Sequence, residues 1–193
     1  MNPLFVVPSW QLPFNNHSNV QDRYVSHLQK YKQNNISLPN ISSTNTFVTQ
    51  PNLHIDPLFE DFVKFGIDCV SQIKPSYNLS PSLNFGLSSM YGTITEKGGM
   101  FRPDMKGEDF LSGVYFLQTP PTSGQLCIKH LISDNSYFRK VHVEIDNTIN
   151  SEMAKMPMPQ GNIVLFPSYL DYFVAQNNSD DASYLIHFSF RLI

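Results

Sequence analysis

The sequence has few charged residues, two cysteines and no long hydrophobic run. Charged residues make up 15% of the 193 positions, against about a quarter in a typical soluble domain. The formal net charge of -3 excludes a nucleic-acid partner bound through bulk positive charge, because phosphate binding needs clustered Lys and Arg. No apolar run approaches the roughly 20 residues of a membrane span, so we expect no membrane partner. The opening residues 1–8 also lack the basic start and the length of a secretory signal.

The two cysteines, Cys69 and Cys127, lie far apart in apolar segments. This spacing predicts buried, reduced thiols rather than a disulfide framework, and therefore a reducing compartment such as the cytoplasm. Hydrophobic residues at 41% and aromatic residues at 13% are enough to fill a core. We expect one domain over residues 19–193, preceded by an extended N-terminal arm over residues 1–18 that is rich in Pro, Asn and aromatics.

Two helices are predicted in the N-terminal half, on either side of a polar loop over residues 34–51. Apolar residues fall on one helical face over residues 20–32. A second helix begins near Asp56, with Pro57 at its first position, where the missing N–H costs nothing. It ends at Pro75.

From residue 83 onward the pattern changes to short strands separated by turns. The predicted strands cover residues 83–95, 113–118, 125–130, 138–145, 161–167, 172–175 and 184–192. Two helices followed by many short strands favour a mainly β fold, a β-sandwich or jelly roll with the two N-terminal helices packed on one face.

Three segments together resemble a known family. They are residues 98–107 with the following strand 111–117, the segment 161–170 around Phe166-Pro167-Ser168, and the last strand, 183–190. In this order and spacing they are similar to the 2-oxoglutarate/Fe(II) oxygenases common in marine bacteria and in tailed phages of cyanobacteria. The resemblance implies a double-stranded β-helix, which is a jelly roll of two sheets.

Such oxygenases hold iron with two histidines and one carboxylate, and leave three positions open for 2-oxoglutarate and oxygen. The resemblance places the first ligand pair at Asp104 and Lys106 and the distal histidine at Tyr172. The arginine that pairs with 2-oxoglutarate corresponds to Ser183. All four positions depart from the family pattern.

These departures argue against an iron site. The ammonium group of Lys106, with an ordinary pKa of about 10.4, is protonated near neutral pH and repels a cation. One carboxylate and one phenol do not replace two imidazoles for Fe(II). The sequence therefore predicts a member without the metal triad, with no cofactor and no catalytic residue. A relocated metal site would need His130 and His142 to meet across a hairpin, and we favour structural roles for both.

We therefore hypothesise a non-catalytic structural, assembly or protein-binding component, in a tailed-phage virion or in the host cytoplasm before assembly. Its partners would be structural subunits or further copies of the same chain. The abundance of Asn, Ser and Tyr and the scarcity of Lys and Glu suit protein interfaces. Within the arm, Phe5, Trp10 and Phe14 are the candidate anchors for a partner.

Two alternatives remain open. The first is an atypical Fe(II)/2-oxoglutarate-dependent hydroxylase, with Asp104 and Tyr172 as ligands and Lys106 holding the co-substrate carboxylate. The second keeps the old pocket for a small metabolite without chemistry, lined by Tyr91, Tyr115 and Tyr172.

Overall fold

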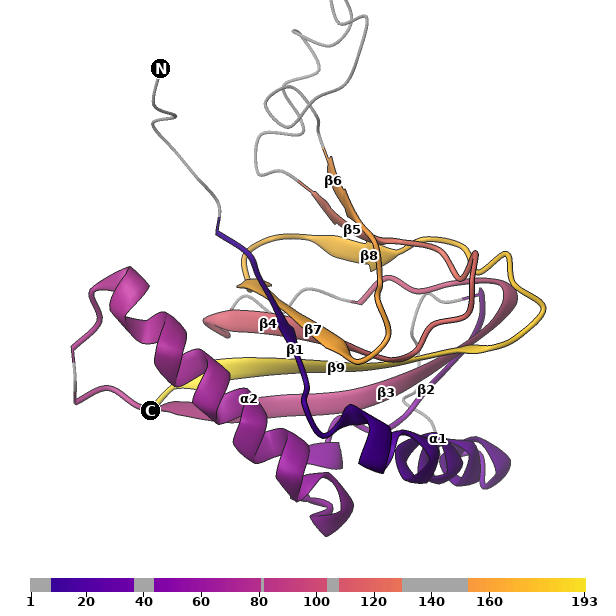
Figure 1. Ribbon diagram of the computed structural model, residues 1–193, viewed down its shortest axis with the longest axis horizontal. Helices are drawn as coiled ribbons and strands as arrows, with labels where there is room; N and C mark the ends of the chain where they lie inside the picture. The colour runs from indigo at the N-terminus through magenta and orange to yellow at the C-terminus, as the bar shows by residue number, and fades with distance from the viewer. Residues whose placement is uncertain (1–7, 37–43, 81, 104–107, 130–152) are drawn as a thin grey trace, which may run out of the picture.

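The computed structural model describes residues 8–36, 44–80, 82–103, 108–129 and 153–193. Their strands form two sheets (Figure 1). The larger has the order β1-β7-β4-β9-β3-β2, and the smaller has the order β6-β5-β8. The strands are β1 Trp10–Pro13, β2 Thr44–Val48, β3 Phe85–Met100, β4 Leu111–Gln118, β5 Leu126–Lys129, β6 Met153–Met156, β7 Asn162–Pro167, β8 Tyr172–Val174 and β9 Ser183–Leu192. All pairings are antiparallel, and the predicted jelly roll is confirmed.

Two helices cover one face of the larger sheet. They are α1, His17–Gln33, and α2, Glu60–Ile73; Figure 1 shows both on the side of the sheet away from β5, β6 and β8. Helix α1 buries Val20, Tyr24 and Leu28, as the sequence periodicity predicts. A short 3-10 turn, Pro57–Phe59, precedes α2, and the Asp56 carboxylate caps it by accepting a hydrogen bond from the Leu58 amide. In the part of the chain that the structure describes, no helix is long and apolar enough to span a membrane.

The core has two parts, because successive residues of a strand face opposite sides of the sheet. On β9, Tyr184, Ile186, Phe188 and Phe190 pack against the helices. Leu185 faces the other way, into the space between the two sheets, with Val114, Phe116, Val164 and Phe166. This second space is the barrel interior, and it holds the positions that the family resemblance points to.

Four strands depart from the sequence prediction, and one of them is β6, which lies outside every predicted strand. Strand β1 lies within the expected arm and pairs with β7. Strand β2 lies within the expected polar loop and pairs with β3. Strand β3 runs on through Gly98 and Gly99 to Met100, although the predicted strand ends at residue 95. The glycines permit this, because Gly98 has a φ of +78° and a Cβ on Gly99 would stand 2.6 Å from the Asn45 carbonyl oxygen. The predicted strand 138–145 lies outside the described residues.

Candidate active site

A histidine on the last strand stands at the centre of the barrel interior. His187 is fully buried. Its Nδ1 lies 3.0 Å from the Tyr172 hydroxyl and its Nε2 lies 3.2 Å from the Thr93 hydroxyl. Burial lowers the imidazole pKa to about 3. The ring is therefore neutral near pH 7, and both of its nitrogens are hydrogen-bonded.

Tyr172, where the sequence resemblance predicts the family's distal histidine, begins β8 in the facing sheet. Its side chain is 7% exposed. Burial, followed by the neighbouring Tyr91, holds the pKa of the phenol well above its ordinary value. Tyr172 is therefore a neutral phenol hydrogen-bonded to His187 and Tyr91. A phenol in this state is a poor ligand for Fe(II).

Aromatic rings close around His187. The Tyr91 ring stacks on the imidazole, with centroids 5.1 Å apart and planes 12° apart. The Phe101 ring lies 4.8 Å away on a tilted plane. Phe101 also exchanges two backbone hydrogen bonds with Val174 of β8. The side chains around His187 therefore form a layer of hydrogen bonds and aromatic contacts that connects the two sheets across the barrel.

Charged residues gather beside this layer. The Asp171 carboxylate, directly before Tyr172, binds the Arg102 guanidinium at 2.9 Å and the Lys129 ammonium at 3.2 Å. Two cations around one carboxylate leave a local excess of positive charge. The described residues therefore place cationic side chains next to the barrel interior rather than inside it.

Ser183, where the sequence resemblance predicts the family's arginine, is buried at the start of β9. Its hydroxyl donates to the Gln118 carbonyl oxygen at 3.5 Å, the long end of a hydrogen bond. No lysine or arginine is among the buried side chains of the described residues. That part of the interior consequently offers no cation to the distal carboxylate of 2-oxoglutarate.

Several predicted site residues cannot be located. Asp104 and Lys106 lie outside the described residues, as do Phe5, His130 and His142. The cysteine prediction is confirmed, because Cys69 and Cys127 are buried and free.

The predicted partner anchors of the arm that are described lie against the chain itself. Phe14 is 5% exposed and sits in the helix-side core. Trp10 packs on Tyr77, with ring centroids 5.8 Å apart. Neither residue extends away from the domain.

The metabolite pocket considered from the sequence is not formed. Tyr115 faces the helices, where its hydroxyl lies 2.7 Å from Nδ1 of His17. Tyr91 and Tyr172 instead surround His187 in the barrel interior. Alternation along β4 separates them, because Val114 and Phe116 take the inward positions.

Sequence reasoning did not pair His187 with Tyr172. Alternation along β9 puts His187 on the face opposite Ile186 and Phe188. That alternation was the available signal. The alternation alone does not identify Tyr172 as the partner of His187. That contact exists because the two sheets are stacked and β8 lies across from β9.

An iron centre needs several donor side chains close together. Among residues 8–36, 44–80, 82–103, 108–129 and 153–193, no three His, Cys, Asp or Glu side chains group closely enough to hold a metal. Tyr172 offers a neutral phenol, and both nitrogens of His187 are already bonded. The described residues alone therefore do not fit a centre of two histidines and one carboxylate.

Part of the sequence matches a known protein family, and the fold resembles that of several solved structures. The sequence model of the family described as "Putative 2OG-Fe(II) oxygenase" matches residues 89–189. No curated protein matches the chain. Among solved structures, a Pseudomonas putida prolyl-4-hydroxylase superposes with a TM-score of 0.68 at 10% identity, covering 96% of this chain and 93% of that one.

Two further structures share the fold. HygX from Streptomyces hygroscopicus, with nickel and 2-oxoglutarate bound, has a TM-score of 0.65 at 11% identity, covering 96% of this chain and 83% of that one. The viral collagen prolyl hydroxylase of Paramecium bursaria Chlorella virus-1 has a TM-score of 0.59 at 9% identity, covering 96% of each chain.

These matches correct two predictions. The hypothesis of a non-catalytic virion or assembly component is wrong, because the family and the structural neighbours point to oxygenases and nothing points to a phage structural role. The prediction of no cofactor is also wrong, because structural neighbours hold 2-oxoglutarate with nickel, or iron. The resemblance itself is confirmed, and the chain belongs to the 2OG-Fe(II) oxygenase family.

Proposed function

We propose that this chain is an Fe(II)- and 2-oxoglutarate-dependent oxygenase of the hydroxylase type with an atypical ligand set. The family match over residues 89–189 carries the proposal, since this stretch runs from β3 into β9 and includes the barrel. The solved structures that share the fold with metal and 2-oxoglutarate bound support it.

The ligand set differs from the family pattern. Tyr172 stands where the distal histidine belongs, and His187 is the imidazole of the described barrel interior. In their present hydrogen-bonded arrangement these two side chains do not complete an iron site. Asp104 is the sequence position that would supply a carboxylate, and Lys106, two residues later, would hold the carboxylate of the co-substrate.

The test uses the full chain with Fe(II), ascorbate and 2-oxoglutarate under air. We expect retained iron of about one per chain, measured by elemental mass spectrometry, and succinate above a no-enzyme blank. Asp104→Ala should lose both signals, whereas Asp22→Ala, a change of the same type on the exposed side of α1, should keep them. Succinate at the level of the blank, with iron removed by one desalting step, would refute the proposal.

The acceptor is a separate question. Prolyl hydroxylases appear among the structural neighbours from Pseudomonas putida, Trichoplax adhaerens and a Chlorella virus. A proline-rich peptide is therefore the first acceptor to add to the succinate assay. Formation of hydroxyproline, detected as the added mass of one oxygen atom in the peptide, would assign the substrate class. Succinate formation that the peptide leaves unchanged would exclude this class.

A further inference from the structure

A hollow opens where β4 begins and β9 ends. It has a volume of about 380 Å³ and is lined by Glu108, Asp109, Phe110, Arg191 and Leu192. This volume lies in the range of small-molecule sites. None of the lining residues occupies a position that the family uses for iron or 2-oxoglutarate.

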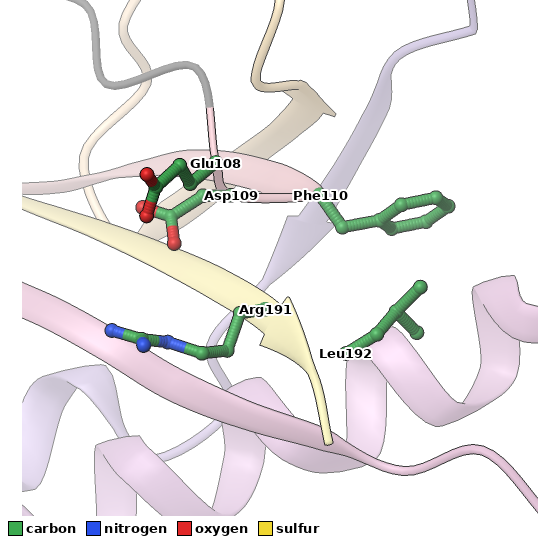
Figure 2. Close-up of a pocket in the computed structure, with 5 residues that line it drawn as sticks. All are labelled: Glu108, Asp109, Phe110, Arg191 and Leu192. Atoms are coloured by element: carbon green, nitrogen blue, oxygen red, sulfur yellow. The ribbon is translucent and has the colours of Figure 1, made fainter.

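The residues that line the hollow form a charged group and an apolar group. Figure 2 shows the carboxylates of Glu108 and Asp109 and the guanidinium of Arg191 on one side of the hollow, with Phe110 and Leu192 on the other. A ligand that fills it must therefore carry charge at one end and an apolar group at the other.

The charged groups are available to a ligand. Glu108 and Arg191 are both exposed, and neither forms an ion pair within the part of the chain that the structure describes. Their formal charges with Asp109 add up to -1. A simple anion would meet two carboxylates and a simple cation would meet the guanidinium, so the arrangement favours a ligand with both charges.

Two of the lining side chains are held in place. The Asp109 carboxylate accepts a hydrogen bond from the Ser189 hydroxyl at 2.6 Å, and that hydroxyl lies 2.8 Å from the Ser89 hydroxyl. The Phe110 ring packs between Tyr77 and Phe85, with centroids 5.0 and 5.5 Å away. One acidic group and the apolar wall are therefore preorganised, which lowers the entropy lost on binding.

We propose that this hollow binds a small zwitterion, an α-amino acid with an apolar side chain. Arg191 holds the carboxylate through the fork of its guanidinium. Glu108 and Asp109 accept hydrogen bonds from the ammonium group, and the side chain lies on Phe110 and Leu192. The site goes beyond the oxygenase assignment and stands independently of it.

The test is calorimetric titration of the full chain with L-leucine and three analogues. 4-Methylpentanoate lacks the ammonium group, 3-methylbutylamine lacks the carboxylate, and glycine lacks the side chain. Since each removes one of the three contacts, we expect each to bind at least about ten-fold more weakly than leucine. Resonances of Phe110 and Leu192 should shift in NMR spectra of the leucine complex.

Matched variants locate the site. Arg191→Gln and Glu108→Gln should each weaken leucine binding about ten-fold or more. Arg23→Gln and Glu60→Gln, which remove the same groups from exposed positions on the helices, should leave it unchanged. All four side chains are exposed, so the variants keep the fold. The proposal is overturned if leucine fails to bind at roughly 10 mM, if an analogue binds equally well, or if both site variants bind like the parent protein.

Discussion

The buried imidazole of His187 predicts a loss of stability in mild acid. Its pKa is about 3 in the folded chain and 6.5 in its ordinary state. The folded-state pKa is therefore depressed, so between these values the unfolded chain binds a proton that the folded chain refuses. The stabilising contribution is fully present above about pH 6.5 and is lost as the pH falls from there toward 3.

The magnitude follows from the linkage between proton binding and folding. One pKa unit corresponds to about 1.4 kcal/mol. Lowering the pH from 7.5 to 5.0 should therefore remove about 2 kcal/mol through this one side chain. That is a large share of the roughly 5–15 kcal/mol by which a domain is stable. The groups that face the imidazole, Tyr91, Tyr172 and Thr93, are uncharged throughout this range and do not offset the loss.

Urea unfolding measures the effect, followed by the fluorescence of Trp10, the single tryptophan. The parent chain and His187→Asn are compared at pH 7.5 and 5.0. The drop in unfolding free energy should be about 2 kcal/mol larger in the parent. Burial also lowers the pKa of His17 and His54, but both residues are present in both proteins, so their contributions cancel.

Equal drops in the two proteins would refute the reasoning. If the variant does not fold, an NMR titration of the parent imidazole decides instead. The His187 ring signals should remain those of a neutral imidazole down to at least about pH 4.5. A midpoint near 6 would show that the ring is solvated and that the hydrogen-bonded layer is not formed.

Two further changes test the packing of the same barrel. Tyr172→Phe removes the hydroxyl that contacts His187, and leaving that buried nitrogen without its partner should cost about 1–3 kcal/mol in urea unfolding; a cost near zero would contradict the hydrogen bond. Gly113→Ala places a Cβ 2.4 Å from the Phe188 ring and should cost about 1–3 kcal/mol. Gly86→Ala is its control, because the new Cβ would stand 3.3 Å from the flexible end of a side chain; equal losses in the two alanine variants would count against the packing of β4 on β9.

Some of the fold follows from short-range patterns. The apolar face of residues 20–32, the start of a helical segment at Asp56 and the strands at 161–167 and 184–192 agree with the structure within a few residues. In each case the periodicity of the residues themselves reports which side is buried. The burial of Cys69 and Cys127, and the placement of His187 on the face opposite Ile186 and Phe188, follow from the same local patterns.

The local sequence gives no comparable pattern for strands β1 and β2. Strand β1 has four residues, one of them Pro13, and pairs with residues about 150 positions later in the chain. Strand β2 is polar and lies at the edge of the sheet beside β3. Edge strands carry weak patterns because only one side is paired and little of their surface is buried. Their existence depends on the partner strand, which the local sequence does not contain.

The sequence by itself determined the family, because the family depends on residue type and order alone. Only the tertiary structure decided which side chains meet in space. Tyr172 contacts His187 because their strands belong to opposite sheets. Arg191 faces Glu108 across the hollow because β4 and β9 are neighbours in one sheet. Such contacts depend on strand register and sheet stacking, which long-range backbone hydrogen bonds fix and no local window of sequence encodes.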